Sequence, residues 1–422
     1  MNDAAARLIP AVREVIDIGL AWRSQLPVLS DRGEPRPVFA NALAALRTAP
    51  AWADVVARDI FAFRTVAVKA TPWGHTGPWS EPQDAVTCDW LQRHGILVSI
   101  DIAARAIETV AEDNPIHPVR EYLDALKWDA RPRLNKLFTF YAGAADTDYS
   151  SAVGCRWAIS AIARIRKPGC KADHVPILEN PQGTLKSSFC RVLGGQFFSD
   201  EIAELGTKDA SMGVASAWII ELGELDAFGR AEQSRLKAFL SRSTDRFRPP
   251  YGRRIIEAPR QSVFIGTTNL AAYLKDETGA RRFWPVRCGE IRIDVLQRDR
   301  DQLWAEAQHR FDAGEPWWID DSALVAEASS EQRARYETDP WEPLIEKWSV
   351  AHATVSVEQV LMVCLEKPKA QWTQADKNRI ARCLQAQGWE RFQRRTGDGR
   401  EWLYRRKSID VTSLSPAEHG KW

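Results

Sequence analysis

Residues 175–200, VPILENPQGTLKSSFCRVLGGQFFSD, constrain the fold of this chain more than any other stretch. The apolar run 175–178 predicts a buried strand, residues 179–185 a turn, and Lys186 the start of a helix. A Lys-Ser pair at a helix start, behind a turn that contains glycine, is typical of a phosphate-binding loop, because backbone N–H groups there attract anions. The side chain of Lys186 would add positive charge, and the hydroxyl of Ser187 would bind Mg²⁺. The expected nucleotide-binding residues are Asn180, Gly183, Thr184, Leu185, Lys186, Ser187 and Ser188.

The loop departs from the pattern G-x-x-x-x-G-K-[ST] at both glycine positions. Asn180 stands at the first and Leu185 at the second. Asparagine tolerates left-handed backbone angles, whereas leucine sits where the phosphates need a close approach of the backbone. An ordinary strand-turn-helix without a nucleotide therefore stays an alternative at this point.

Polar side chains follow two more apolar runs, in the order that a phosphate-binding loop requires. Residues 216–221 predict a strand that ends in Glu221, with Glu224 shortly after it, and residues 261–268 predict a strand followed by Asn269. The first acid would bind Mg²⁺, the second would activate a water molecule, and Asn269 would orient that water; the two acids can also exchange roles. The alternative is that these are ordinary polar residues of surface turns.

Two arginine-rich segments extend the candidate site. The adjacent Arg281 and Arg282 could reach the nucleotide of a neighbouring subunit, or could simply form a surface ion pair. Residues 241–254 hold five arginines and one aspartate among aromatic residues, with the hairpin-tip composition Pro-Pro-Tyr-Gly. Such a loop suits a single-stranded nucleic acid, and a salt-bridge loop between subunits is the alternative. The expected DNA-binding residues are Arg246, Arg248, Tyr251, Arg253 and Arg254.

The remaining patterns predict several domains in a chain of 422 residues. Alternating strands and helices predict a parallel α/β core with a helical collar over residues 113–315. We expect a mostly helical region of unassigned function at 1–112, a helical linker at 316–340 and a tail at 408–422. Seven scattered cysteines and the absence of a long apolar run predict a cytoplasmic protein without disulfides, signal peptide or membrane contact.

Residues 341–407 read as three helices followed by two strand-like runs, which is typical of a winged helix. This segment carries 13 Lys/Arg against 8 Asp/Glu, a net charge of +5, and much of the excess lies in the two runs. The basic charge favours contact with DNA, and a protein–protein module is the alternative.

Six stretches resemble the virulence-associated E family (VapE), P-loop proteins related to superfamily 3 helicases. They are HPVREYLDALKWD, ENPQGTLKSSFCRVLGGQFFSD, WIIELGELDAF, KAFLSRSTDRFRPPYGRR, QSVFIGTTN and TGARRFWPV, in this order along the chain. The resemblance implies an AAA+-like ATPase core that binds ATP and Mg²⁺. It assigns phosphate and Mg²⁺ binding to Gly183, Lys186 and Ser187, and the acids of the Walker B motif to Glu221 and Glu224. It further assigns the sensor to Asn269, the trans-acting arginine to Arg281 or Arg282, and a DNA-contacting hairpin to residues 246–254.

The resulting hypothesis is an ATP-driven helicase or replication-initiation protein of a phage or other mobile element. We expect a homo-oligomeric ring, a hexamer by the resemblance, that acts on single-stranded and origin DNA and relies on another protein for a primase or polymerase. Two alternatives stay open: a DNA-binding regulatory or defence NTPase whose degenerate site does not drive unwinding, and an assembly scaffold.

Overall fold

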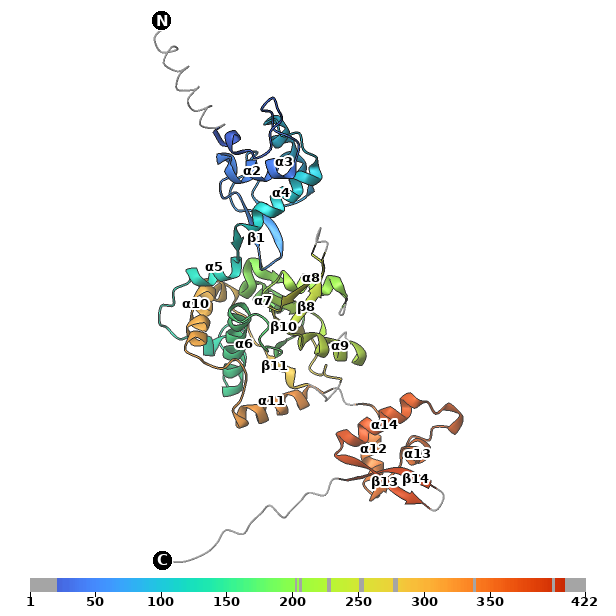
Figure 1. The fold of residues 1–422 in the computed structure, drawn as a ribbon. Coiled ribbons are helices and arrows are strands. Elements are labelled where there is room, and N and C mark those ends of the chain that lie inside the picture. The colour runs from blue at the N-terminus through green and yellow to red at the C-terminus, as the bar shows by residue number, and fades with distance from the viewer. Residues whose placement is uncertain are drawn as a thin grey trace, which may run out of the picture. The chain divides into compact units, whose positions relative to one another are not determined.

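The computed structural model describes residues 21–201, 203–204, 207–225, 229–249, 254–275, 280–336, 339–396 and 399–406. The chain divides into two compact units (Figure 1). The larger contains residues up to 271 together with 281–332, and the smaller contains 272–280 and the residues from 333 onward. Each unit has a hydrophobic core of its own.

The first part of the larger unit combines helices with a small sheet. Its helices are α2 Phe39–Thr48, α3 Glu81–Arg93 and α4 Ile100–Glu112. Its strands, in the order β3-β2-β1-β4, are β1 Val56–Asp59, β2 Arg64–Ala67, β3 Gly77–Pro78 and β4 Pro115–Ile116. The mostly helical pattern predicted for this region missed most of the sheet, because strands of two to four residues leave almost no periodicity in a sequence.

A five-stranded, all-parallel sheet forms the centre of the larger unit and confirms the predicted α/β class. Its strands are β5 Val175–Glu179, β6 Phe198–Ser199, β7 Ile219–Leu222, β10 Val263–Thr268 and β11 Phe283–Arg287. Their spatial order is β11-β5-β10-β7-β6, so β10 lies between β5 and β7. Every residue of β5 and β10 is buried, as expected for parallel strands covered on both faces.

Helices surround this sheet (Figure 1). They are α5 Pro118–Ala125, α6 Asp148–Arg166, α7 Lys186–Gly194, α8 Lys208–Ala215, α9 Arg230–Leu240, α10 Ile293–Asp312 and α11 Ser322–Ala334. The side chain of Thr147 caps α6 by accepting the N–H of Ser150. Three tryptophans, Trp157, Trp218 and Trp304, are fully buried beside the sheet, and the Trp218 and Trp304 rings lie 4.5 Å apart. The unusually frequent tryptophans thus serve the core here.

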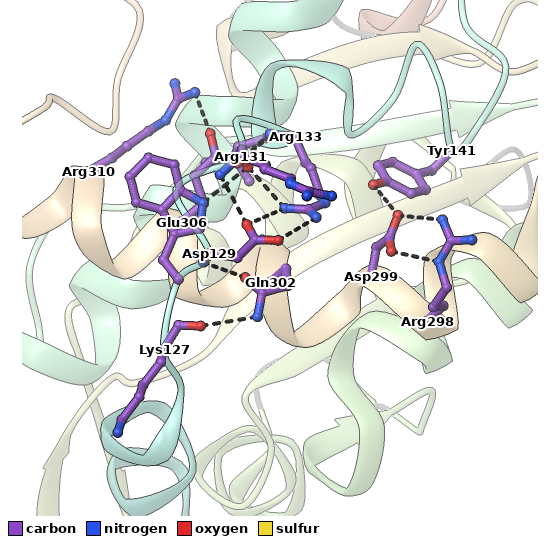
Figure 2. Close-up of polar contacts among 12 residues, drawn as sticks. Lys127, Asp129, Arg131, Arg133, Tyr141, Arg298, Asp299, Gln302, Glu306 and Arg310 are labelled. Carbon is purple, nitrogen blue, oxygen red and sulfur yellow. Dashed lines mark hydrogen bonds and ion pairs between the residues drawn. The ribbon is translucent and has the colours of Figure 1, made fainter.

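Helix α10 holds the segment that follows α5 (Figure 2). The buried carboxylate of Glu306 accepts a 2.6 Å hydrogen bond from Arg310 and a 2.9 Å bond from the backbone N–H of Leu134. Within the segment, Asp129 pairs with Arg133 at 2.7 Å, and this bond lowers the pKa of Asp129 to about 2. These hydrogen bonds form a polar network that joins α10 to the segment between α5 and α6.

Among its described residues, the smaller unit contains three α-helices, a short 3-10 helix at Lys369–Gln371 and a three-stranded antiparallel sheet. Its helices are α12 Glu342–Ser349, α13 Val357–Gln359, which continues as a π-helix over Val360–Cys364, and α14 Gln374–Ala386. Its strands are β12 Thr354–Val355, β13 Trp389–Thr396 and β14 Gly399–Arg406, with β14 in the middle. Strands β13 and β14 form a long hairpin.

The seven cysteines are free thiols. Within the described ranges, no helix combines the length and the apolar composition that crossing a bilayer requires.

Candidate phosphate-binding site

The turn between β5 and α7 adopts the tight path that a phosphate-binding loop needs. Gly183 and Leu185 both have left-handed backbone angles, with φ of 83° and 64°. Leu185 immediately precedes α7, and its side chain makes no capping hydrogen bond to the helix. The leucine side chain is instead exposed, at 51% of its full surface. Leu185 stands where the motif has glycine, and it adopts this left-handed conformation at a strain of about 1–2 kcal/mol.

Lys186 lies at the centre of the turn and is buried. Its Nζ donates hydrogen bonds to the carbonyl oxygens of Asn180 and Pro181, at 2.5 and 3.0 Å, and to Oδ1 of Asn269 at 3.1 Å. The Asn180 side chain in turn donates to the carbonyl oxygen of Gly289 at 3.0 Å. The structure therefore brings Lys186 and Asn269 together, although 83 positions separate them in the sequence.

Ser187 and Glu221 also meet. The Ser187 hydroxyl donates to Oε1 of Glu221 at 2.7 Å, and the Thr267 hydroxyl donates to the same oxygen at 2.8 Å. The second oxygen, Oε2, is buried and has no hydrogen-bond partner among the described residues. A buried carboxylate oxygen without a donor is costly unless a cation completes it. A serine hydroxyl and one carboxylate fit Mg²⁺, which prefers oxygen ligands and takes few of them from the protein when phosphates supply others.

These residues line a cavity of about 860 Å³ at the carboxyl ends of the parallel strands. Among the predicted residues, the cavity is bordered by Gly183, Thr184, Leu185, Lys186, Ser187, Ser188, Glu221, Glu224 and Asn269. Asn180 does not border it and acts through its contact with Lys186. Glu224 is exposed, with a left-handed φ of 50°. The carboxyl ends of parallel strands are where open α/β sheets bind ligands.

Sequence reasoning missed part of the cavity wall. The additional polar residues are Gln182, Asp200, Glu204, Glu232, Arg235, Thr267 and Thr268. Among all lining residues, the acids Asp200, Glu204, Glu221, Glu224 and Glu232 outnumber the cations Lys186 and Arg235. An anionic nucleotide would therefore need a divalent cation to enter this cavity. Thr267 stands two positions before the predicted Asn269, but Arg235 lies in mid-helix, where no motif marks it.

The two adjacent arginines have different surroundings, and neither borders the cavity. The Nε of Arg282 donates to the Asp173 carboxylate at 3.1 Å and to the Ser241 hydroxyl at 2.9 Å, and its side chain is only 17% exposed. Arg281 is exposed. The structure thus uses Arg282 within its own subunit and leaves Arg281 directed to the surface.

The arginine-rich segment forms a two-stranded antiparallel hairpin of β8 Thr244–Phe247 and β9 Ile256–Pro259. Arg248 and Arg254 are exposed on it, and Arg246 pairs with Glu257 at 3.2 Å. Tyr251 and Arg253 lie outside the described residues.

A buried ion pair anchors the base of this hairpin. The guanidinium group of Arg260 donates two hydrogen bonds to Asp245, at 2.8 and 2.6 Å, and a third to the Phe239 carbonyl oxygen at 2.6 Å. The side chains of the pair are 0% and 1% exposed. The one aspartate of the segment is therefore a structural partner of Arg260, and the exposed charge of the hairpin is more basic than its composition suggests.

Comparison with known proteins gives one family match. Residues 123–337 match the virulence-associated protein E-like domain. No curated protein matches the chain. Solved structures that resemble it include the apo structure of the NrS-1 C-terminal region (305–718), with a TM-score of 0.48, 13% identity, and coverage of 83% of this chain and 95% of that one. Another is the A form apo structure of the NrS-1 C-terminal region, with a TM-score of 0.40, 15% identity, and coverage of 68% and 78%.

Proposed function

Because the chain belongs to the virulence-associated protein E-like family, we propose that it is a Mg²⁺-dependent ATPase whose nucleotide lies in the cavity beside α7. One observation carries the proposal. Ser187 and Glu221 share a 2.7 Å hydrogen bond next to the Lys186 loop, while the other Glu221 oxygen is buried and has no described donor. When bound, Mg²⁺ would be held by Ser187 and Glu221 and would neutralise negative charge on the phosphates.

Three residues of the cavity have further roles in ATP hydrolysis, which follow from their positions. Lys186 exchanges its present bonds to backbone carbonyls for bonds to the phosphates, at the N-terminus of α7. Asn269 stays within hydrogen-bonding distance of Lys186 and can orient a water molecule beside the terminal phosphate. Glu224 is exposed in the same cavity and is the candidate general base for that water.

The finer proposal is a ring-forming DNA helicase or replication-initiation protein. Three observations support it. Arg281 is exposed outside the cavity, so in any complex it is available to the nucleotide of a second copy of the chain. The β8–β9 hairpin presents Arg248 and Arg254 on a rigidly anchored base, which suits contact with single-stranded DNA. The helix and strand order of the smaller unit suits a winged helix that binds origin DNA.

The test is ATP hydrolysis by the purified chain and by Lys186→Ala. We expect the variant to lose hydrolysis, because the cation facing the phosphates is gone. Lys171→Ala is the matched control, since Lys171 is exposed and does not border the cavity, and it should hydrolyse ATP like the wild type. Hydrolysis that survives in Lys186→Ala would refute this site.

A second function is favoured by one feature, the exposed Leu185 side chain at the cavity wall. A nucleotide site weakened by this leucine suits a DNA-binding regulatory or defence protein that changes conformation without unwinding DNA. Strand displacement separates the two functions. Displacement that requires ATP hydrolysis supports the helicase, and nucleotide-dependent DNA binding without displacement supports the regulator.

A further inference from the structure

The β13–β14 hairpin of the smaller unit has two faces of different chemistry. Residues directly opposite each other in an antiparallel pair lie on the same face, and alternate residues point to opposite faces. The pairs Gln393↔Trp402 and Arg395↔Arg400 therefore share a face with the pair Arg391↔Tyr404. The pairs Arg394↔Glu401 and Glu390↔Arg405 lie on the other face.

Positive charge is concentrated on the first of these faces. We define the basic wing face by its residues beyond the core, Arg391, Gln393, Arg395, Arg400 and Trp402. It carries three arginines and no acid, whereas the opposite face balances two arginines with two glutamates, and there Arg405 pairs with Glu390 at 2.6 Å. Within the described ranges, Arg395 and Arg400 are exposed and form no ion pair. This face thus offers unneutralised positive charge that the opposite face lacks.

An exposed indole lies among these arginines. Trp402 is 48% exposed, although neighbouring large aromatics of the hairpin, Trp389 and Tyr404, are buried at 3% and 2%. The guanidinium of Arg391 stacks on the Trp402 ring, 4.0 Å from its centre. Arg391 therefore supports the indole from one side, and about half of the side chain stays available to solvent. Leaving so large an apolar surface exposed on a protruding hairpin has a cost that a ligand would recover.

We infer that the basic wing face is a single-stranded DNA-binding surface on which Trp402 stacks against an unpaired base while Arg395 and Arg400 contact phosphates. A polyanion with flat aromatic groups matches an arginine-flanked indole, and a base is open to stacking when it is unpaired or terminal. The choice of DNA over RNA rests on the proposed function; the stacking surface itself is independent of the nucleotide site.

The hairpin provides a matched test, because Arg394 and Arg395 are adjacent but point to opposite faces. Binding of a fluorescently labelled oligo-dT to the full chain is measured without nucleotide, over a range of salt concentrations. We expect Arg395→Ala and Arg400→Ala each to weaken binding and to reduce the salt slope by about 0.7, the value for one phosphate contact on a single strand. Arg394→Ala should leave both quantities unchanged. Equal effects of Arg394→Ala and Arg395→Ala would overturn the assignment of the face.

Stacking is tested separately with an oligonucleotide that contains 2-aminopurine, whose fluorescence changes when it stacks. Trp402→Ala should weaken binding about tenfold and abolish the fluorescence change, while Trp402→Phe should retain part of both. Trp318→Ala is the control, since Trp318 is similarly exposed, at 44%, in the other unit. An unaltered signal in Trp402→Ala would refute the inference, and so would RNA that competes as well as single-stranded DNA. Because this binding is measured without nucleotide, a failed ATPase proposal and a failed wing proposal give different results.

Discussion

Replacing Glu221 with glutamine should stabilise the protein without ligand and remove its response to Mg²⁺-nucleotide. In the present arrangement Oε1 accepts hydrogen bonds from Ser187 and Thr267, at 2.7 and 2.8 Å, and Oε2 is buried without a described donor. Glutamine is isosteric with glutamate, so its carbonyl oxygen can keep both bonds. The change replaces a buried carboxylate oxygen with an amide nitrogen at the unpaired position.

The expected size follows from the cost of an unsatisfied buried group, roughly 1–3 kcal/mol when neutral and more when charged. Because the amide is also left unpaired, only the difference is recovered, and we expect a gain in the free energy of unfolding of about 1 kcal/mol. For a unit of this size the gain corresponds to a rise of about 1–2 °C in the unfolding midpoint. Saturating ligand reverses the order, since a ligand at about 100 times its Kd adds about 2.7 kcal/mol to the wild type and nothing to a variant that cannot bind it.

The assay is thermal unfolding of the larger unit with EDTA and then with Mg²⁺ and a non-hydrolysable ATP analogue. Glu221→Gln should unfold above the wild type in EDTA and below it with ligand. Glu204→Gln removes the same charge from an exposed position on the same cavity wall and should leave the EDTA midpoint unchanged. A lower midpoint for Glu221→Gln in EDTA would refute the reasoning about the unpaired oxygen, and an undiminished ligand shift would refute its role at the metal.

Three further predictions follow from single contacts. In a fluorescent-nucleotide titration, Leu185→Gly should bind Mg²⁺-nucleotide more tightly than the wild type. Glycine adopts the φ of 64° without strain, and the change removes the leucine side chain from the cavity wall. Unchanged or weaker affinity would contradict this prediction. Arg281→Ala subunits mixed with wild type should inhibit ATP hydrolysis more than simple dilution does. Arg282→Ala should chiefly lower the free energy of unfolding, by roughly 2–3 kcal/mol, because the buried carboxylate of Asp173 loses its guanidinium partner. The reverse pattern would exchange the roles of the two arginines. Burial lowers the pKa of His174 below 6.5, so the unfolded state binds protons more readily than the folded state. The free energy of unfolding should therefore fall as pH drops through 6.5. In pH-dependent denaturation His174→Gln should make this fall shallower, and an unchanged slope would exclude His174 as its cause.

The sequence predicted the local part of the site well. Apolar runs predicted the strands observed as β5, β7 and β10, and the start of α7 at Lys186 was correct to the residue. These features are readable because burial on both faces requires uninterrupted apolar residues, and because polar residues can begin only where the strand leaves the core. Most of the short strands of the first region were missed, because strands of two to four residues leave almost no periodicity in a sequence.

What the sequence alone determined is therefore which segments become strands and which polar residues stand at their ends. The tertiary structure decided which of these residues meet. Placing β10 between β5 and β7 brings Asn269 to Lys186 and Thr267 to Glu221. The tertiary structure also gives the adjacent Arg281 and Arg282 different surroundings, because Arg282 bonds to Asp173 and Ser241, which belong to other parts of the chain. Contacts of this kind depend on strand order and on burial, and neither can be predicted from a local sequence motif.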